Sequence, residues 1–203
     1  MGFYAKHILP HVLDCACRTK PVQMQREKLV PKARGRVLEI GLGGGLNLPF
    51  YDAGAVEHLW ALEPAAEMRR LAQDRIDNSP ISVETIDAGA EAIPLESACA
   101  DTVVSTYTLC TIPDPESALA ERRRVLRPDG VLLFCEHGRA PDEAVRKWQD
   151  RVDPLWTRVA GGCHINRDIE GLIAGAGFAF AALETMYIPG WRPASFNFSA
   201  SAG

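Results

Sequence analysis

The segment over residues 37–45 is the feature that most constrains this chain. It reads Val-Leu-Glu-Ile-Gly-Leu-Gly-Gly-Gly, a short apolar run with one acid, followed by closely spaced glycines. Such an apolar run predicts a buried strand, and glycines directly after it let the backbone turn and approach a ligand closely. We therefore expect a strand that leads into a cofactor-binding turn.

The spacing of these glycines separates two classes of cofactor. A dinucleotide-binding turn needs glycines at its first, third and sixth positions, where the last one lets helix and strand pack closely under a pyrophosphate. Counted from Gly41, the glycines fall at the first, third and fifth positions, and the sixth residue is Leu46. This spacing disfavours an NAD-dependent dehydrogenase and favours a cofactor without phosphates, with Glu39 suited to a cationic group. A glycine-rich turn without a ligand is the alternative for so short a motif.

Length and composition indicate one globular unit. The 203 residues are close to the length of a single domain, and a net charge of -4 gives no general attraction to nucleic acid. No stretch approaches the roughly 18 apolar residues of a membrane span, and the start of the chain lacks the apolar core of a signal peptide. We expect a single cytoplasmic domain over residues 1–203, with no nucleic-acid partner and no stable membrane insertion. The oligomeric state stays open.

Strand-like and helix-like segments alternate along the chain, which predicts an α/β fold with a doubly wound, mostly parallel, seven-stranded sheet. Two amphipathic helices, at 3–17 and 21–30, are expected to form an N-terminal helical lid within residues 1–34. After the first strand, we expect strands at 58–62, 81–86, 102–106, 131–135, 178–183 and 196–199. Helices are expected at 65–77, 115–126 and 169–176, and residues 141–167 form an insertion over the substrate side.

The cysteines and histidines give a weaker signal. Six cysteines are scattered at 15, 17, 99, 110, 135 and 163, which matches neither a dense disulfide framework nor a paired zinc motif. His7, His11 and Cys15 recur at four-residue steps with Cys17 nearby, so they would share one helix face. A metal site there is the less favoured alternative, because the same steps are typical of a packing stripe. We expect reduced cysteines and no metal.

Ligands of doubly wound sheets bind beyond the carboxyl ends of the strands, so residues that follow each strand are the candidates for the site. Glu63 and Pro64 follow the second expected strand, where a carboxylate can accept both hydroxyls of a ribose. An acid that only meets a helix dipole is the alternative. The segment 87–95 follows the third strand and can offer backbone amides to a ring. The segment 106–110 follows the fourth strand and is expected to border the reacting group.

Five motifs in this order resemble class I S-adenosylmethionine-dependent methyltransferases, namely residues 37–45, 63–64, 90–94, 101–106 and 124–130. A closer resemblance, to bacterial relatives of the methyltransferase-like seven group, rests on 108–110, 136–137, 153–156, 162–163 and 166–167. Some members of that group methylate alkyl thiols. The resemblance implies a Rossmann-like methyltransferase fold, S-adenosylmethionine as cofactor, and a small, largely apolar acceptor with a thiol favoured. A phospholipid amine or a quinone-like ring as acceptor, and a cofactor-binding module without catalysis, stay open.

Carried over position by position, the resemblance implies a row of cofactor contacts. The glycines would wrap the methionine portion, Glu63 would hold the ribose, and residues 106–109 would lie under the sulfonium. Residues 90 and 91 would flank the adenine. The expected cofactor-binding residues are Glu39, Gly41, Gly43, Gly45, Asn47, Glu63, Pro64, Met68, Ala90, Glu91, Thr106, Tyr107 and Leu109.

The acceptor side is expected near a histidine. A thiol must lose its proton to become strongly nucleophilic, and an imidazole can accept that proton near neutral pH. His137, at the expected end of the fifth strand, is therefore the first candidate for the catalytic residue, with a structural hydrogen bond to a loop or to Glu136 as the alternative. The residues expected to contact the substrate are Cys110, Trp156, Cys163 and His164. The cysteines are expected to line the pocket and not to act as nucleophiles, and burial against the sheet is the alternative for Trp156.

Overall fold

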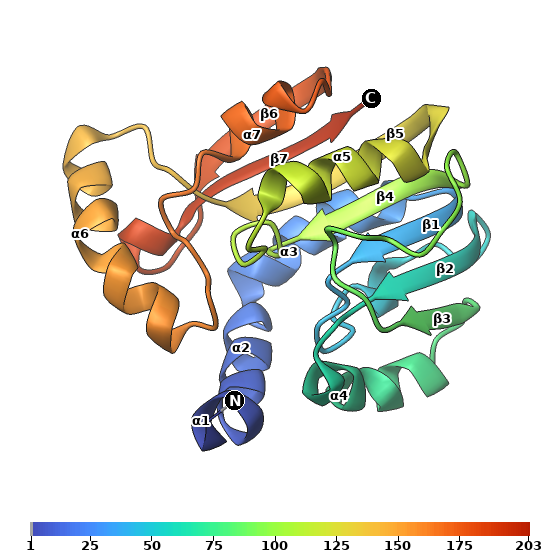
Figure 1. The fold of residues 1–203 in the computed structure, drawn as a ribbon, viewed down its shortest axis with the longest axis horizontal. Helices are drawn as coiled ribbons and strands as arrows, with labels where there is room; N and C mark the ends of the chain where they lie inside the picture. Colours follow the sequence, from blue (N-terminus) through green and yellow to red (C-terminus); the bar gives the residue numbers. More distant parts are fainter. Residues whose placement is uncertain (1) are drawn as a thin grey trace.

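The structure, a computed structural model, describes residues 2–203 (Figure 1). Within that range the strands form one seven-stranded sheet. The strands are β1 Gly35–Ile40, β2 Val56–Leu62, β3 Val83–Ile86, β4 Ala100–Thr106, β5 Leu126–His137, β6 Phe180–Tyr187 and β7 Phe196–Ala202. Their order across the sheet is β3-β2-β1-β4-β5-β7-β6. The strands β1 to β5 pair in parallel, and β7 runs antiparallel to both β5 and β6. The expected mostly parallel sheet is confirmed.

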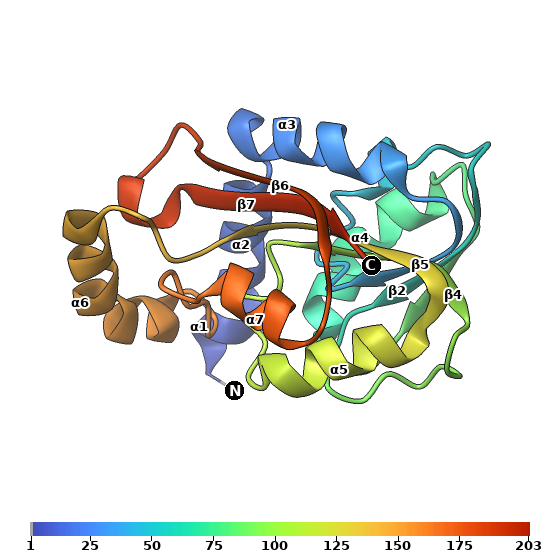
Figure 2. The ribbon, with the colours of Figure 1, turned by 90° about the horizontal axis from the view of Figure 1, so that it is seen from above.

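Helices cover both faces of this sheet. They are α1 Phe3–His7, α2 Leu9–Cys17, α3 Lys20–Leu29, α4 Ala66–Asp77, α5 Pro115–Val125, α6 Glu143–Val159 and α7 Ile169–Gly175. Seen from above, α3 lies on one face of the sheet, whereas α5 and α7 lie on the opposite face (Figure 2). Three short 3₁₀ helices occupy Val30–Lys32, Leu48–Phe50 and Arg192–Ala194. No helix within residues 2–203 has both the length and the apolar character needed to cross a bilayer.

The alternation of side chains along β1 explains the two layers. Leu38 and Ile40 are buried in the core cluster that includes residues of α5 and α7, whereas Val37 is buried in the cluster that includes residues of α3 and α4. Successive side chains of a strand point to opposite faces, so a strand that is apolar at nearly every position has to be covered on both sides. The sequence of β1 therefore requires cover on both faces of the sheet, and the structure shows helices on both faces.

Three expected elements differ most from the structure, and the ends of the others shift by three residues or fewer. The single helix expected over 3–17 is two helices, because the chain breaks at Ile8, just before the first turn of α2, which contains Pro10. Proline disfavours helical backbone in the residue before it and donates no hydrogen bond. The strand expected over 178–183 begins instead at Phe180 and continues to Tyr187, since Gly177 has a φ of +83° and Phe178 precedes the strand. The strand expected over 131–135 extends over 126–137.

The strand order places a crevice at one point of the sheet. β1 lies between β2 and β4, so the chain builds the sheet in one direction from β1 to β3 and in the other from β4 onward. Loops that leave the carboxyl ends of β1 and β4 turn away to opposite faces, and this switch point is where open α/β sheets bind ligands. The glycine turn follows β1, and residues 107–110 follow β4, so both lie at that crevice.

Candidate functional site

The glycine turn after β1 is held tightly against the loop after β4. Gly41 and Gly43 have φ values of +73° and +56°, in the left-handed region that favours glycine. A Cβ atom at Gly41 would lie 2.5 Å from side-chain atoms of Thr108, so the two loops pack directly on each other. A Cβ at Gly43 would meet only the Met68 Cε at an ordinary 3.6 Å and the Gly41 carbonyl at 4.0 Å, so this position needs glycine for its conformation. Gly45 is buried and also left-handed.

Glu39, near the end of β1, is a buried carboxylate with two donors. The Asn47 Nδ2 donates to one oxygen at 3.0 Å, and the Tyr51 hydroxyl donates to the other at 2.8 Å. Burial raises the pKa of Glu39 to about 7, although these hydrogen bonds oppose the shift. Asn47 also bonds Thr106 at 3.0 Å and accepts from the Arg26 Nε at 3.0 Å. The acid is thus fixed between the ends of β1 and β4.

Glu63, directly after β2, organises the glycine turn. Its two carboxylate oxygens accept the backbone N–H groups of Gly43 and Ala65, each at 2.9 Å. Burial raises the pKa of this carboxyl group against those hydrogen bonds. Pro64, which follows it, is exposed. Two acids at neighbouring strand ends, with left-handed glycines between them, make a set of hydrogen-bond acceptors that fits a cofactor carrying both an ammonium group and ribose hydroxyls.

The two residues expected beside the adenine have different surroundings. Ala90 is buried in the apolar core on the side of α5 and α7. Glu91 is partly exposed, and its Oε1 lies 3.5 Å from the backbone nitrogen of Asp114. Asp87, at the end of β3, pairs with the Arg69 Nη2 at 2.6 Å. The structure therefore brings the glycines, Glu39, Asn47, Glu63, Met68 and Thr106 into one group, with Ala90 and Glu91 on the adjoining loop.

The loop after β4 is shaped by a buried acid. Tyr107 has a left-handed φ of +54°, unusual for a side chain of this size, and its hydroxyl donates to the Asn197 Oδ1 at 2.7 Å. The backbone N–H groups of Thr108 and Leu109 donate to the carboxylate of Glu136 at distances between 2.9 and 3.1 Å. Burial raises the pKa of Glu136 to about 7. These contacts fix the path of the backbone into Cys110.

Cys110, His137 and Cys163 come together at the far end of that loop. Their Sγ and ring nitrogen atoms all lie within 4.8 Å of one another, and the Cys163 Sγ is 3.3 Å from the His137 Nε2. A hydrogen bond from Cys163 holds the pKa of Cys110 well below its usual range, helped by His137, and the same bond raises the pKa of Cys163. Burial lowers the pKa of His137, but the charge of Cys110, the hydrogen bond to Cys110 and the charge of Glu136 together outweigh burial, and the net pKa is raised.

Two other expected substrate residues border this cluster in different ways. Trp156 packs against Cys110, Cys163 and Ile165, and its ring lies 5.4 Å from that of Trp191. His164 donates its backbone N–H to the Cys110 carbonyl at 2.9 Å, but its ring bonds the Asp153 carboxylate at 2.8 Å. The imidazole of His164 is therefore engaged away from the cysteines, whereas Trp156 covers them.

The N-terminal helices contact both loops of the crevice, the glycine turn after β1 and the loop after β4. The side chain of Asp14, in α2, lies against Gly44 and 3.4 Å from the Arg75 Nη1. The Arg26 Nη1, in α3, donates to the Cys17 carbonyl at 2.8 Å, and its guanidinium lies over the Tyr107 ring. His7, His11 and Cys15 are exposed on this arm, and in the described part of the chain they do not join a cluster that could hold a metal.

Four buried or half-buried residues of this site were missed by the sequence-based expectations, namely Arg26, Tyr51, Glu136 and Asn197. Glu136 belonged to a resemblance motif, and its polar character inside an apolar strand is the signal that identifies it. The other three lie outside the motifs, so the sequence offers no comparable signal for them. All four hold neighbouring loops in place through side-chain hydrogen bonds.

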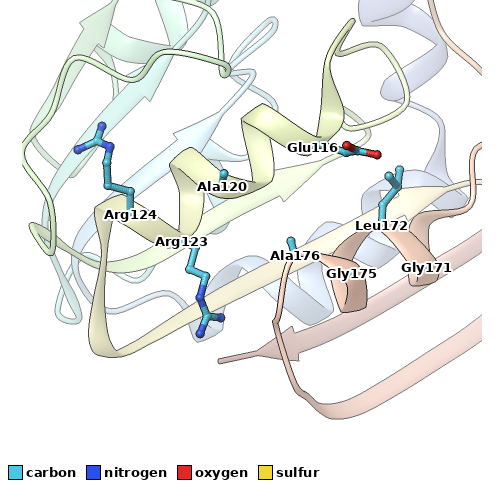
Figure 3. Close-up of a pocket in the computed structure, with 8 residues that line it drawn as sticks. All are labelled: Glu116, Ala120, Arg123, Arg124, Gly171, Leu172, Gly175 and Ala176. Carbon is cyan, nitrogen blue, oxygen red and sulfur yellow. The ribbon is translucent and has the colours of Figure 1, made fainter.

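A separate hollow lies between α5 and α7 (Figure 3). Arg123, Leu172 and Ala176 are among its lining residues, and none of the expected site residues lines it. The Arg123 Nη1 donates to the Gly177 carbonyl at 2.6 Å, so this cation serves to join α5 to the loop after α7. The chemistry of the site lies at the carboxyl edge of the sheet instead.

Comparisons with known proteins show which family the chain resembles. A family model described as a methyltransferase domain matches residues 38–134, which include the glycine turn, both acids and the loop after β4. The thiol S-methyltransferase TMT1B of Homo sapiens is 32% identical over 168 residues, covering 79% of this chain and 68% of that protein. TMT1B of Rattus norvegicus is 30% identical over 165 residues. The matched region spans 64% of the length of the rat protein, slightly less than two thirds.

Solved structures show the same fold. The S-adenosylmethionine-dependent methyltransferase from Thermotoga maritima superposes with a TM-score of 0.65 at 21% identity, covering 97% of this chain and 98% of that one. At this identity the likeness concerns the fold alone. It extends over nearly the whole chain.

Proposed function

Because the chain belongs to the methyltransferase family, we propose that it transfers a methyl group from S-adenosylmethionine to a small, largely apolar thiol. One observation carries this proposal. The loop after β4 joins the glycine crevice to the cluster of sulfur and imidazole groups, since Thr108 packs against Gly41 and Cys110 faces His137 and Cys163. Cofactor and acceptor would thus meet along a single short segment of backbone.

The residues of the crevice match the parts of the cofactor. Glu39 would take the ammonium group, Glu63 the ribose hydroxyls, and the left-handed glycines would follow the methionine portion. Residues 106–109 would lie beneath the sulfonium. When bound, S-adenosylmethionine supplies an electrophilic methyl group on a good leaving group, so the protein contributes mainly by positioning the acceptor.

The acceptor end combines an imidazole with an apolar surface. The Nε2 of His137 is occupied by the Cys163 sulfur, and among residues 2–203 its buried Nδ1 has no hydrogen-bond partner. We propose His137 as the catalytic residue, with Nδ1 as the atom that receives the thiol proton. Trp156, Ala160 and Ile165 form the apolar wall around the two cysteines, which suits an alkyl thiol better than a charged amine.

A methyl-transfer screen tests this proposal. Radiolabelled S-adenosylmethionine is offered with alkyl thiols, amines and quinols, and we expect label in the thioether products. His137→Ala should lower kcat for the thiol by about 10²–10⁴, the usual contribution of a general base. The matched control is His58→Ala, because His58 lies on β2 and bonds the exposed Glu84, away from the crevice.

Three outcomes would contradict the proposal. Label in a lipid amine or a quinol, with none in any thiol, would reassign the acceptor. Tight binding of S-adenosylhomocysteine without transfer to any compound would indicate a binding module without catalysis. An equal loss of activity in His58→Ala and His137→Ala would remove the assigned role of the histidine.

A further inference from the structure

Three potential metal ligands converge from segments that are far apart in the sequence. Cys110 lies in the loop after β4, His137 ends β5, and Cys163 lies in the loop after α6. Two of the three side chains are buried, and the third is half-buried. Their ligand atoms all lie within 4.8 Å of one another. Within the described residues this is the group of histidine, cysteine and acidic side chains that is compact enough to share one ion.

The donor set fits one ion in particular. Zinc binds cysteine sulfur at about 2.3 Å and histidine nitrogen at about 2.0–2.1 Å in tetrahedral geometry, so neighbouring ligand atoms lie roughly 3.5–3.8 Å apart. The 3.3 Å between the Cys163 Sγ and the His137 Nε2 is already close to that spacing. Two cysteines with one histidine also form a known catalytic zinc set, which leaves the fourth position open.

The surrounding structure holds the two loops that carry Cys110 and Cys163. The Arg167 Nη1 donates to the carbonyls of Leu109 and Ile112 at 2.5 and 2.7 Å, on either side of Cys110. The Asp153 Oδ1 accepts the backbone N–H of Ile165 at 2.9 Å, which holds the loop that carries Cys163. Outer contacts of this kind orient the ligands of metal sites.

Unpaired polar atoms gather at the same place. In the part of the chain that the structure describes, only three residues have buried side-chain nitrogen or oxygen atoms without a hydrogen-bond partner: Arg122, His137 and Trp156. Two of these three border the cluster. A buried polar atom without a partner is costly. The Trp156 N–H can only donate, and the unpaired His137 atom is Nδ1, so these atoms leave the Nε2 of His137 as the nitrogen that faces the cysteines.

We propose that Cys110, His137 and Cys163 bind a zinc ion whose open fourth position takes the sulfur of the acceptor thiol. This inference rests on the proposed methyl transfer to a thiol, and it replaces the proton-accepting role of His137 with zinc coordination. On binding, the S–H bond of the acceptor breaks, a zinc–sulfur bond forms, and the proton leaves to water. The bound thiolate keeps a lone pair for the methyl group, and His137 becomes a ligand in place of a proton acceptor.

Cobalt substitution tests the site without relying on activity. Chelator-treated protein, kept reduced and free of oxygen, is titrated with Co²⁺, and we expect about one ion per chain with tetrahedral visible bands and a thiolate-to-cobalt charge-transfer band. Cys110→Ser, Cys163→Ser and His137→Ala should each weaken binding at least tenfold, because loss of even a supporting residue costs about 10–100-fold. Cys99→Ser is the matched control, since Cys99 lies outside the crevice, and circular dichroism checks that each variant is folded.

The acceptor step has its own readout. An alkyl thiol added to the cobalt protein without cofactor should shift the visible bands, whereas an alcohol of the same length should not. The inference is overturned if wild-type protein binds no Co²⁺ or Zn²⁺, if Cys99→Ser weakens binding as much as Cys110→Ser, or if the thiol leaves the spectrum unchanged. Thiol methylation by rigorously metal-free protein would overturn the zinc site and leave the proposed function standing. Zinc bound by the three residues without methylation of any thiol would contradict the proposed function instead.

Discussion

At the scale of single residues, Glu39 couples the binding of the cofactor to pH. Burial raises its pKa to about 7, well above the 4.5 of an exposed glutamate. The folded protein therefore holds a proton on Glu39 between about pH 4.5 and 7, and the unfolded chain does not. The free energy of unfolding should fall as the pH rises through that range, and above pH 7 the buried charge costs about 3 kcal/mol.

We predict that ionised Glu39 is the form that accepts the cofactor ammonium group. The affinity for S-adenosylhomocysteine, which retains that group, should then fall by up to about tenfold per pH unit below pH 7. Calorimetric titration between pH 5.5 and 8 measures this slope, and Glu39→Gln should flatten it. Glu57→Gln, at an exposed position of β2, is the control. A slope that Glu39→Gln leaves unchanged would assign the proton to another group.

At the scale of elements, α2 closes over the glycine turn through one side chain. Asp14 lies 3.4 Å from both Arg18 and Arg75, and its carboxylate is only 13% exposed. The helical lid expected over residues 1–34 predicts that Asp14→Ala loosens this contact. Hydrogen exchange in residues 9–17 should become about 2–5-fold faster, the equivalent of one partly exposed ion pair.

The matched control for the lid is His11→Ala, because His11 lies exposed on the same helix. Its exchange rates should equal those of the wild type. If Asp14→Ala also leaves exchange unchanged, packing rather than the ion pair holds α2 in place. Asp14 would then not be the contact that holds the lid closed.

The positions of most elements could be predicted because each has a local signal. The central strands are apolar runs bounded by turn residues, and α5 begins at Pro115 after Asp114, whose side chain accepts the Ser117 N–H at 3.1 Å. The antiparallel placement of β7 between β5 and β6 has no such signal. The position of a strand in the sheet depends on which neighbouring strands still have unpaired edges, and the residues of the strand itself carry no signal for that.

At the scale of the whole molecule, a bound cofactor product should stabilise the fold. At a concentration 100 times its Kd, S-adenosylhomocysteine is expected to add about 2.7 kcal/mol, which raises the Tm of a chain this long by roughly 5–10 °C. Differential scanning fluorimetry measures the shift, and NAD at the same concentration should give none. Glu63→Ala should reduce the shift, since it removes the proposed ribose contact. A shift with NAD would reopen the dehydrogenase alternative.

The parts of the site that lie in one contiguous motif could be predicted from the sequence, and the parts that several distant segments supply could not. The glycine turn and Glu63 lie in contiguous motifs, so their grouping at the sheet edge could be inferred from strand order alone. Cys110, His137 and Cys163 were expected separately, but their spacing matches no metal motif, because three different segments supply them. Only the assembled fold shows that they face one another.

The pairing of β7 beside β5 links the two halves of the site. The glycine turn, both acids and the loop after β4 all lie before residue 111, whereas β7 covers Phe196–Ala202. His137 pairs in register with Asn197, which also accepts the hydroxyl of Tyr107. Both the histidine of the acceptor side and the loop that borders the cofactor crevice therefore depend on β7, so a change that unpairs this strand would disturb the two halves of the site together.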